Sequence, residues 1–245
     1  MSIDYDTPPG MGKGLEPRDF MAHPVGEMFA PFPFPAMANS EIDDRLEVMA
    51  TNKATLVDLR NIGMNGQPIP STNQGSRGYC WAHSTVSCML LLRAKAGLPY
   101  VELSAYAIAC QIKNFRDQGG WNGESMKWVE EHGCPTSQTW PIRSVDRANV
   151  NSAMVAESLE NRVTEWWDGG DDPKLFWTAV ALGFPIASDY NDWGHSVCFA
   201  FGSRKNNTGI IWNSWGDQWK NNGMGPPQAR SPVPNNWLCP RVTTA

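Results

Sequence analysis

The chain has 245 residues, enough for one large domain with its own core, and its formal net charge is −5 with 18% charged residues. A weakly acidic chain without a basic block does not suit a nucleic-acid backbone or an anionic membrane surface, so we expect neither as a partner. Glycine and proline are frequent, with 22 and 19 residues, which predicts many loops.

The N-terminus and the cysteines both indicate a protein that is not exported. The first residues, MSIDYDTPPG, lack a basic region followed by an apolar run, so no signal peptide for secretion is predicted. The six cysteines and four histidines show none of the close spacings of zinc sites, so we expect no metal and no cofactor. We expect free thiols and a reducing location, cytoplasmic or incorporated in an assembled particle.

Residues 1–53 are predicted to form an extended N-terminal arm. Three prolines between 31 and 35 alternate with phenylalanines, a pattern that fits neither a helix nor a central strand. The apolar side chains of the arm are Phe20, Met28, Phe29, Phe32 and Phe34. A segment of this composition is mobile unless it lies against something. We therefore expect residues 1–50 to dock on the chain's own body or on a protein partner in a larger assembly.

The body is predicted to span residues 54–224 and to begin with a strand over 54–60. A turn-rich stretch with Asn65 and Gly66 follows. A helix is then predicted from Cys80, because apolar residues recur at helical spacing until the stop signals at Gly97 and Pro99.

The second part of the body changes from helices to strands. Helices are predicted over 124–132 and 151–167, and another begins with Asp172 as N-cap and Pro173 at its first position. Short β-prone runs follow, at 185–188, 195–201 and 209–213. This order predicts an α+β protein with helices and strands segregated. The Pro-rich tail, residues 225–245, is predicted to be irregular.

Cys80 is the strongest candidate nucleophile. It stands where a glycine-containing loop enters a helix, and there backbone N–H groups and the helix dipole favour a thiolate. Gln74, six residues earlier, is placed to add a side-chain N–H to the Cys80 backbone N–H as donors for a developing oxyanion. His83, Cys88 and the remaining cysteines suit ordinary packing positions better than catalytic ones.

A base for this nucleophile is predicted on a hairpin later in the chain. His195 opens one strand and Asn213 closes the next, so an antiparallel pairing brings them together. The Asn213 amide oxygen then accepts from one ring nitrogen and leaves the other to face the sulfur. Trp215 is expected to shield this bond from water.

These motifs resemble the active-site segments of papain-like cysteine peptidases, the papain and cathepsin family. The sequence Gln-Gly-x-x-Gly-x-Cys-Trp carries Gln74 and Cys80, a His-x-Val run carries His195, and Asn-Ser-Trp-Gly carries Asn213. The resemblance covers about residues 54–224. It implies a two-subdomain α+β fold, with Cys80 in a helical left half and His195 and Asn213 in an antiparallel β right half. The composition adds extended Pro-rich arms at both ends.

Several positions depart from the family's pattern. Arg77 stands where the family has a cysteine, bridged to a second one in a Gly-Cys-Asn-Gly-Gly motif that reads Gly-Trp121-Asn-Gly123-Glu124 here. Glu124 replaces a glycine that lines the main specificity pocket in the family. The resemblance implies substrate-binding roles for Gly123, Glu124 and Trp215, but it does not carry over the family's substrate preference.

Two functions follow from this sequence, with a third as a weaker option. The first is a peptidase that hydrolyses polypeptides through the Cys80, His195 and Asn213 constellation. The alternative is a structural or assembly subunit, of a virus or phage particle for example, in which the arms join neighbours and proteolysis is limited or lost. A cell-wall amidase fits less well, because Asn-Ser-Trp-Gly is not expected there.

Overall fold

The computed structural model describes residues 7–25, 30–63 and 66–244. Met28 and Phe29 of the predicted arm and Asn65 of the predicted turn lie outside the described residues. The elements in chain order are α1 (Asn39–Thr51), α2 (Leu56–Ile62), α3 (Cys80–Lys95), α4 (Ala105–Ile112), α5 (Asn122–Glu131), the 3₁₀ turn η1 (Arg147–Asn149), α6 (Ser152–Ser158), β1 (Val163–Gly170), α7 (Pro173–Ala181), β2 (Ile186–Tyr190), β3 (His195–Ser203), β4 (Thr208–Trp212), β5 (Met224–Gly225) and β6 (Asn236–Thr243).

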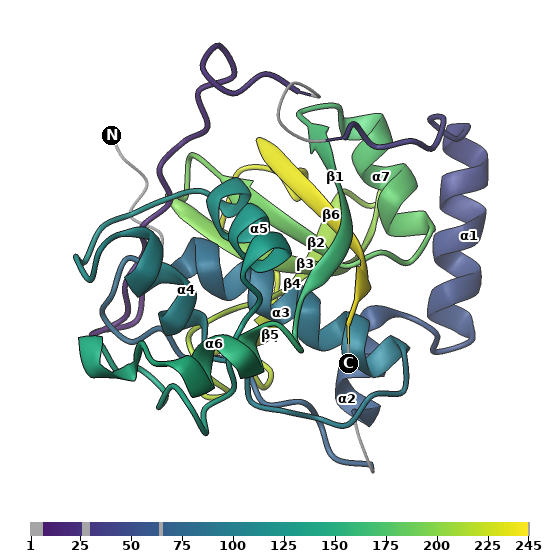
Figure 1. Cartoon of the computed structure of the whole chain (residues 1–245). Coiled ribbons are helices and arrows are strands. Elements are labelled where there is room, and N and C mark those ends of the chain that lie inside the picture. The colour runs from purple at the N-terminus through teal and green to yellow at the C-terminus, as the bar shows by residue number, and fades with distance from the viewer. Residues whose placement is uncertain (1–6, 26–29, 64–65, 245) are drawn as a thin grey trace.

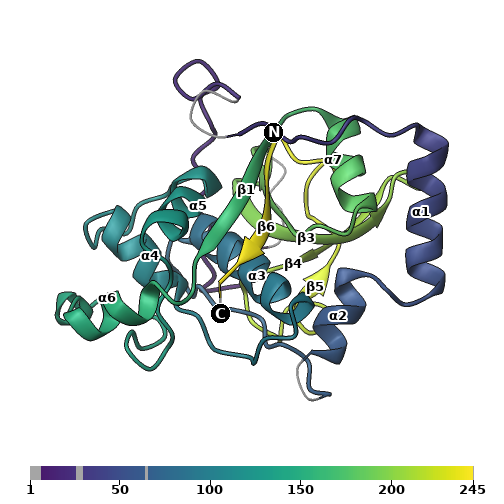
Figure 2. The same cartoon turned by 45° about the vertical axis from the view of Figure 1, so that its right-hand side comes forward.

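The six strands form one antiparallel sheet with the order β1-β6-β2-β3-β4-β5. Helices α4, α5 and α6 gather at one side of the molecule, and α1 and α7 lie at the other (Figure 1). The view turned by 45° shows the same separation (Figure 2). This arrangement confirms the predicted α+β class with a helical half and a β half.

Helix α3 is the central helix of the fold. All its residues from Cys80 to Arg93 are buried, which is typical of a helix that is covered on every side. It contacts β3 of the sheet as well as α4 and α5 of the helical half. The first residue of α3 is therefore held where the two halves meet, which we call the junction.

The predicted hairpin is formed by β3 and β4. These strands pair antiparallel, with Cys198 opposite Trp212 and Ser203 opposite Thr208. Because the turn lies at the far end, the start of β3 and the residue after β4 come together at the open end. The hairpin therefore brings His195 next to Asn213, as the sequence predicts.

The strand predicted over 54–60 is wrong, because residues 56–60 belong to helix α2. Thr55 is its N-cap: its side chain accepts from the Asp58 N–H at 3.1 Å, and the Asp58 carboxylate accepts from the Thr55 N–H at 3.0 Å. This capping box satisfies two N–H groups at the helix start. The cap outweighs the β-branched residues of the segment.

The single helix predicted over 151–167 is also wrong. The structure has the short helix α6 there, followed by strand β1. Val155 and Leu159, part of the predicted apolar stripe, are exposed, whereas Val163 and Trp166 are buried in the strand. The helical spacing of the four residues was therefore accidental.

The C-terminal tail is not irregular over its whole length. Residues 236–243 form β6, which pairs with β1 on one side and with β2 on the other. The partners of β6 come from strands far away in the sequence, so local patterns could not reveal it. The predicted helices that start at 124 and 173 are present as α5 and α7, and Asp172 caps α7.

The N-terminal arm lies on the chain's own body. Residues 39–51 form α1, which packs on α7 and β3, so the expectation of an extended arm is wrong for this part. Phe32 is buried, and its ring contacts those of Trp167 and Trp237 edge to face. Residues 7–25 contain no helix, and Figure 1 shows this segment in purple.

Candidate active site

The thiol of Cys80 is fully buried at the first residue of α3. Burial raises the pKa of Cys80 to about 12, although backbone N–H groups of Ser196, Trp81 and Gly14 stabilise the thiolate and lower it. Ser196 follows His195 directly, so the sulfur lies beside the start of β3. At neutral pH the buried sulfur is a protonated thiol.

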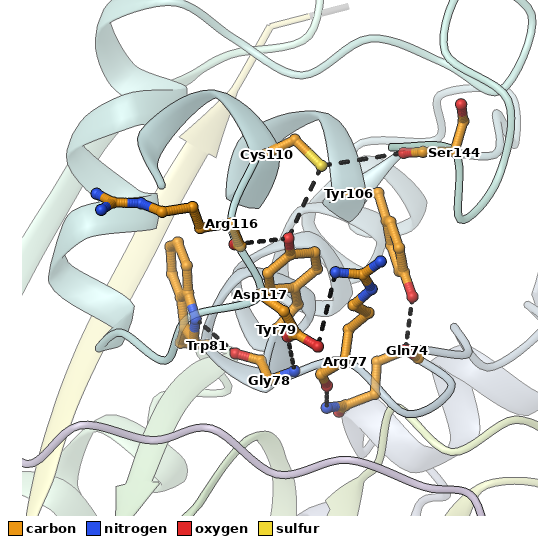
Figure 3. A network of polar contacts seen from close by, with 10 residues as sticks. All are labelled: Gln74, Arg77, Gly78, Tyr79, Trp81, Tyr106, Cys110, Arg116, Asp117 and Ser144. Atoms are coloured by element: carbon orange, nitrogen blue, oxygen red, sulfur yellow. Dashed lines mark hydrogen bonds and ion pairs between the residues drawn. The ribbon is translucent and has the colours of Figure 1, made fainter. Parts of the chain in front are cut away.

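The loop before α3 is fixed by a network of polar contacts (Figure 3). The Gln74 side chain donates to the Arg77 carbonyl at 2.7 Å, and the Tyr106 hydroxyl donates to the Gln74 carbonyl at 2.7 Å. Asp117 accepts from the Gly78 N–H at 2.9 Å and pairs with the Arg77 guanidinium at 3.6 Å. These contacts set the path of the backbone into the helix.

The Arg77–Asp117 pair corrects the expected position of a family disulfide. The resemblance placed the partner position of Arg77 at Trp121, but the structure pairs Arg77 with Asp117 instead. All six cysteines are free and buried. An ion pair and a backbone hydrogen bond thus join the two segments that the family's bridge is expected to join.

His195 is held by Asn213. The distance between His195 Nε2 and Asn213 Oδ1 is 2.8 Å, and both side chains are fully buried. Asn213 Oδ1 also accepts from the Ser214 N–H at 2.8 Å, which orients the amide. The other ring nitrogen, Nδ1, has no hydrogen-bond partner among the described residues. The bond to Nε2 therefore orients the imidazole ring, and Nδ1 is available to accept a proton.

Two indole rings exclude water from the imidazole. Trp215 stacks on His195 with ring centres 4.7 Å apart, and Trp193 meets it edge to face at 4.6 Å. Burial lowers the pKa of His195 to about 3, and the charge of Lys13 lowers it further, against the Asn213 hydrogen bond that raises it. The imidazole is therefore neutral in this arrangement, like the thiol.

Gln74, the fourth predicted catalytic residue, is bound to the residue that follows Asn213. Its backbone N–H donates to the Ser214 carbonyl at 2.9 Å, and its side-chain oxygen accepts from the Ser214 hydroxyl. Ser214 follows Asn213, just as Ser196, which donates its N–H to Cys80, follows His195. A continuous series of contacts therefore connects the four residues at the junction.

The three residues predicted to bind substrate lie in different surroundings. Gly123 is in the first turn of α5, where an added Cβ would lie 2.0 Å from the Trp121 ring, so it is a packing position. The Glu124 carboxylate forms an ion pair with Lys113 at 2.6 Å. Trp215 is the one of the three that donates a hydrogen bond to the arm, from Nε1 to the Gly12 carbonyl at 3.0 Å.

The arm is bound to the helical half by its backbone. The Gly12 N–H donates to the Gly75 carbonyl at 2.7 Å, and the Gly120 N–H donates to the Gly14 carbonyl at 2.9 Å. The Glu16 N–H in turn donates to the Gly120 carbonyl at 2.9 Å, so the arm forms a parallel bridge at this glycine. Residues 12–16 therefore lie on the helical side of the junction like an added strand.

The same residues also contact the β half. The Leu15 N–H donates to the carbonyl of Gly194, the residue before His195, at 3.2 Å. Gly12 and Gly14 allow this close approach: a Cβ added at either would lie 2.3 Å from a backbone carbonyl oxygen, of Arg77 or Gly78 respectively. The arm thus fills the junction directly over Cys80.

The arm does not present a peptide bond for attack. The Gly14 N–H donates to the Gly194 carbonyl at 3.4 Å and also interacts with the Cys80 sulfur, while the Gly14 carbonyl accepts from the Gly120 N–H. A nucleophile needs the carbonyl carbon, with the oxygen directed at oxyanion donors. In this position the arm therefore blocks the sulfur without being placed as a substrate.

Beyond the sulfur, the arm buries the side chain of Arg18. Its guanidinium binds Asp168 of β1 through two contacts, Nη1 to Oδ1 at 2.8 Å and Nη2 to Oδ2 at 2.7 Å. Nη1 also donates to Asn236 Oδ1 at 2.9 Å, and the Trp121 ring lies 5.2 Å from the guanidinium carbon. Both members of the ion pair are inaccessible to solvent.

Asp189 connects this cluster with the thiol. Its carboxylate accepts from Asn236 Nδ2 at 3.2 Å, and its charge acts on the pKa of Cys80. Burial raises the pKa of Asp189 to about 7, while hydrogen bonds and the charge of Arg18 lower it. A polar path therefore leads from Arg18 through Asn236 and Asp189 to the sulfur.

Sequence reasoning missed the residues that bind the arm and those around Arg18. Two signals were present: the Gly12-x-Gly14 spacing allows close backbone approach, and Asp189 is a charged residue inside an apolar strand whose residues are all buried. The pairing of Arg18 with Asp168 spans 150 residues and left no local signal.

Neither a metal site nor a membrane span is found in the part of the chain that the structure describes. Residues 7–25, 30–63 and 66–244 contain no group of three or more His, Cys, Asp or Glu side chains that could hold a metal ion. Within the same ranges, no helix has the length and apolar character needed to cross a bilayer.

Comparison with known sequences points to one family. Residues 54–169 match the model of the papain family cysteine protease. Zingipain-2 of Zingiber officinale is 31% identical over 103 residues, which are 40% of this chain and 47% of that protein. Chymopapain of Carica papaya is 22% identical over 78% of this chain and 59% of its own length. The matched segments thus span about half of these relatives.

Comparison with solved structures concerns the fold. Xylellain, a cysteine protease from Xylella fastidiosa, has a TM-score of 0.66 at 16% identity, covering 95% of this chain and 96% of that chain. Digestive procathepsin L 3 of Tenebrio molitor has a TM-score of 0.58 at 15% identity, covering 83% and 89%. Residues 54–169 thus resemble the papain family cysteine protease, and the chain shares the fold of these solved cysteine proteases.

Proposed function

We propose that the chain is a peptidase that hydrolyses peptide bonds in polypeptides, with Cys80 as nucleophile. His195 takes the thiol proton and delivers it to the leaving amine, while Asn213 keeps the imidazole oriented. Gln74 Nε2 and the Cys80 backbone N–H stabilise the oxyanion of the tetrahedral intermediate. Water activated by His195 then releases the acyl group from the sulfur.

The arrangement of His195 supports this proposal most. Its Nε2 is bound to Asn213 Oδ1 at 2.8 Å, and its Nδ1 makes no hydrogen bond with the described residues. The next residue, Ser196, directs its N–H at the Cys80 sulfur. A base that is oriented through one ring nitrogen, and whose other nitrogen is free to take a proton, is what nucleophilic catalysis requires.

In this proposal residues 11–16 keep the peptidase inactive. They cover the sulfur, and burial there keeps the thiol protonated and the imidazole neutral. When the arm leaves, water reaches both groups, so the pKa of Cys80 falls and that of His195 rises. Both changes favour transfer of the proton from sulfur to imidazole, and the vacated junction becomes the substrate cleft.

Hydrolysis of fluorescent casein by the Gly14→Val variant tests the proposal. The valine Cβ would lie 2.3 Å from the Gly78 carbonyl oxygen, so the arm cannot seat. We expect casein cleavage by this variant, and a loss of about a thousandfold or more on adding Cys80→Ala. Equal cleavage with and without Cys80 would remove it from the mechanism.

The alternative of an assembly subunit in a virus or phage particle has no support among the relatives above, which are named as proteases or are members of the papain family. The expected reducing location and a protein partner for the arm stay predictions.

A further inference from the structure

The site that holds Arg18 is built for a planar guanidinium. Asp168 offers two oxygens to Nη1 and Nη2, and Asn236 adds a third acceptor. Asp168 is itself oriented, because its Oδ1 accepts from the Gly170 N–H at 3.0 Å. The Trp121 ring lies 5.2 Å from the guanidinium carbon. We call Asp168, Asn236 and Trp121 the guanidinium site.

The guanidinium site belongs to the body of the protein, whereas its occupant belongs to the arm. Asp168 lies in β1, Asn236 in β6 and Trp121 just before α5. Arg18 comes only two residues after Glu16, the last arm residue that bonds to Gly120 over the junction. The site is therefore reached by the side chain of any peptide that lies in the junction at the place of the arm.

Departure of the arm changes the charge of this site. Without Arg18, the carboxylate of Asp168 loses its ion-pair partner, and Asn236 also contacts the carboxylate of Asp189. A buried carboxylate without a partner is strongly unfavourable. A cation from the substrate removes that penalty, whereas an apolar or acidic side chain does not.

We propose that the guanidinium site receives an arginine side chain of the substrate, so that the peptidase selects polypeptides with arginine close to the cleaved bond. This inference rests on the proposed function. Arginine is favoured over lysine, because an ammonium group lacks the planar fork that matches Asp168 and stacks less well on Trp121.

Binding to the full-length Arg18→Ala variant tests the site without any turnover. The probe is N-acetylarginine amide, titrated calorimetrically, and N-acetylcitrulline amide has the same shape without the charge. A third probe, N-acetyllysine amide, carries the charge without the planar fork. We expect the arginine probe to bind at least about tenfold more tightly than the citrulline and lysine probes. Adding Asp168→Asn should abolish this preference. Equal affinity for all three probes would mean that Arg18 is only a structural anchor of the arm.

A second measurement covers the case in which Arg18→Ala does not fold. The Gly14→Val variant keeps Arg18 but displaces the arm, and its kcat/KM is compared for peptides that carry arginine or citrulline at each position. We expect arginine to be preferred about tenfold or more at one position. The preference should be lost in Arg18→Ala/Asp168→Asn. It should be kept in the control Glu165→Gln, which changes a partly exposed carboxylate in β1, the strand that contains Asp168.

The two measurements separate this inference from the proposed function. Arginine binding without any cleavage would uphold the guanidinium site and overturn the peptidase. Cleavage without a preference for arginine at any position would uphold the peptidase and overturn the guanidinium site.

Discussion

Two buried polar sites lie under the same arm, and one is neutral whereas the other is ionised. Cys80 and His195 are neutral, because burial raises the pKa of the thiol to about 12 and lowers that of the imidazole to about 3. Arg18 and Asp168 form an ion pair with two close contacts although neither is accessible to solvent. Burial neutralises a group that lacks a strong partner, and a well-matched partner keeps a buried charge.

The difference means that release of the arm acts on the two sites in opposite directions. Water that reaches Cys80 and His195 favours their ionised forms, which the chemistry needs. Loss of Arg18 removes the ion-pair partner of Asp168. Under the proposed function, release of the arm activates the first site and removes the cation from the second.

The largest effect is expected from Arg18→Ala. It leaves the Asp168 carboxylate buried without its partner, which should lower the free energy of unfolding by about 3–5 kcal/mol. Arg18→Ala/Asp168→Asn should recover a large part of this loss, because the charge is removed as well. Urea denaturation measures both.

Arg45→Ala is the matched control for this prediction. Arg45 forms an exposed ion pair with Glu41, so its loss should lower the free energy of unfolding by less than about 0.5 kcal/mol. If Arg18→Ala lowers the free energy of unfolding by no more than Arg45→Ala does, the buried ion pair contributes no more to stability than the exposed one.

Gly14→Val should release the arm without removing any charge. The substitution breaks the backbone hydrogen bonds around Gly120 and Gly194. At about 1 kcal/mol for each bond, exchange of the amide hydrogens of residues 12–16 should become on the order of a hundredfold faster. Met21→Ala, at an exposed arm position, should leave the exchange unchanged. Unchanged exchange in Gly14→Val would show that the arm is held by other contacts.

Asn213→Ala should affect the reaction more than the fold. It removes the bond that orients His195, so in the Gly14→Val background we expect casein hydrolysis to fall about tenfold. Asn206→Ala, in the exposed turn between β3 and β4, is the control. Full activity of Asn213→Ala would exclude Asn213 from the mechanism.

The effect of Asp189→Asn differs from the others because it depends on pH. Burial raises the pKa of Asp189 from 3.8 to about 7, so its contribution to stability is fully present below pH 3.8 and is lost as pH rises to about 7. The asparagine does not ionise. The Tm of the variant relative to the original chain should therefore increase from pH 4 to pH 7 and then level off. A difference in Tm that stays constant between pH 4 and pH 7 would contradict the raised pKa of Asp189.

The part of the site around Cys80 and His195 could be predicted from the sequence because its geometry is local. Cys80 is at the start of a helix whose apolar spacing is clear, and Gln74 is six residues before it. His195 and Asn213 meet across a single hairpin, whose register follows from pairing of adjacent strands. These relations need only short-range patterns.

The remaining parts depend on contacts between distant segments. Strand β6 is stabilised by β1 and β2, and the tail itself has a Pro-rich composition that suggested no structure. The place of Arg18 follows only from Asp168 and Asn236, far along the chain. Helix α2 is an exception, since the Thr55 and Asp58 capping box is local and could have been recognised.

The most direct test is the rate at which iodoacetamide alkylates Cys80 at different pH values. Peptide mass spectrometry measures this rate in the original chain and in Gly14→Val. Burial under the arm predicts slow labelling of the full chain that increases only at strongly alkaline pH, since thiolates are the reactive species. Gly14→Val should react rapidly near neutral pH, and adding His195→Ala should remove this reactivity. If Cys80 reacts equally slowly in both chains, or if the His195 substitution has no effect, the sulfur and the imidazole do not act as a pair and the arm does not control them.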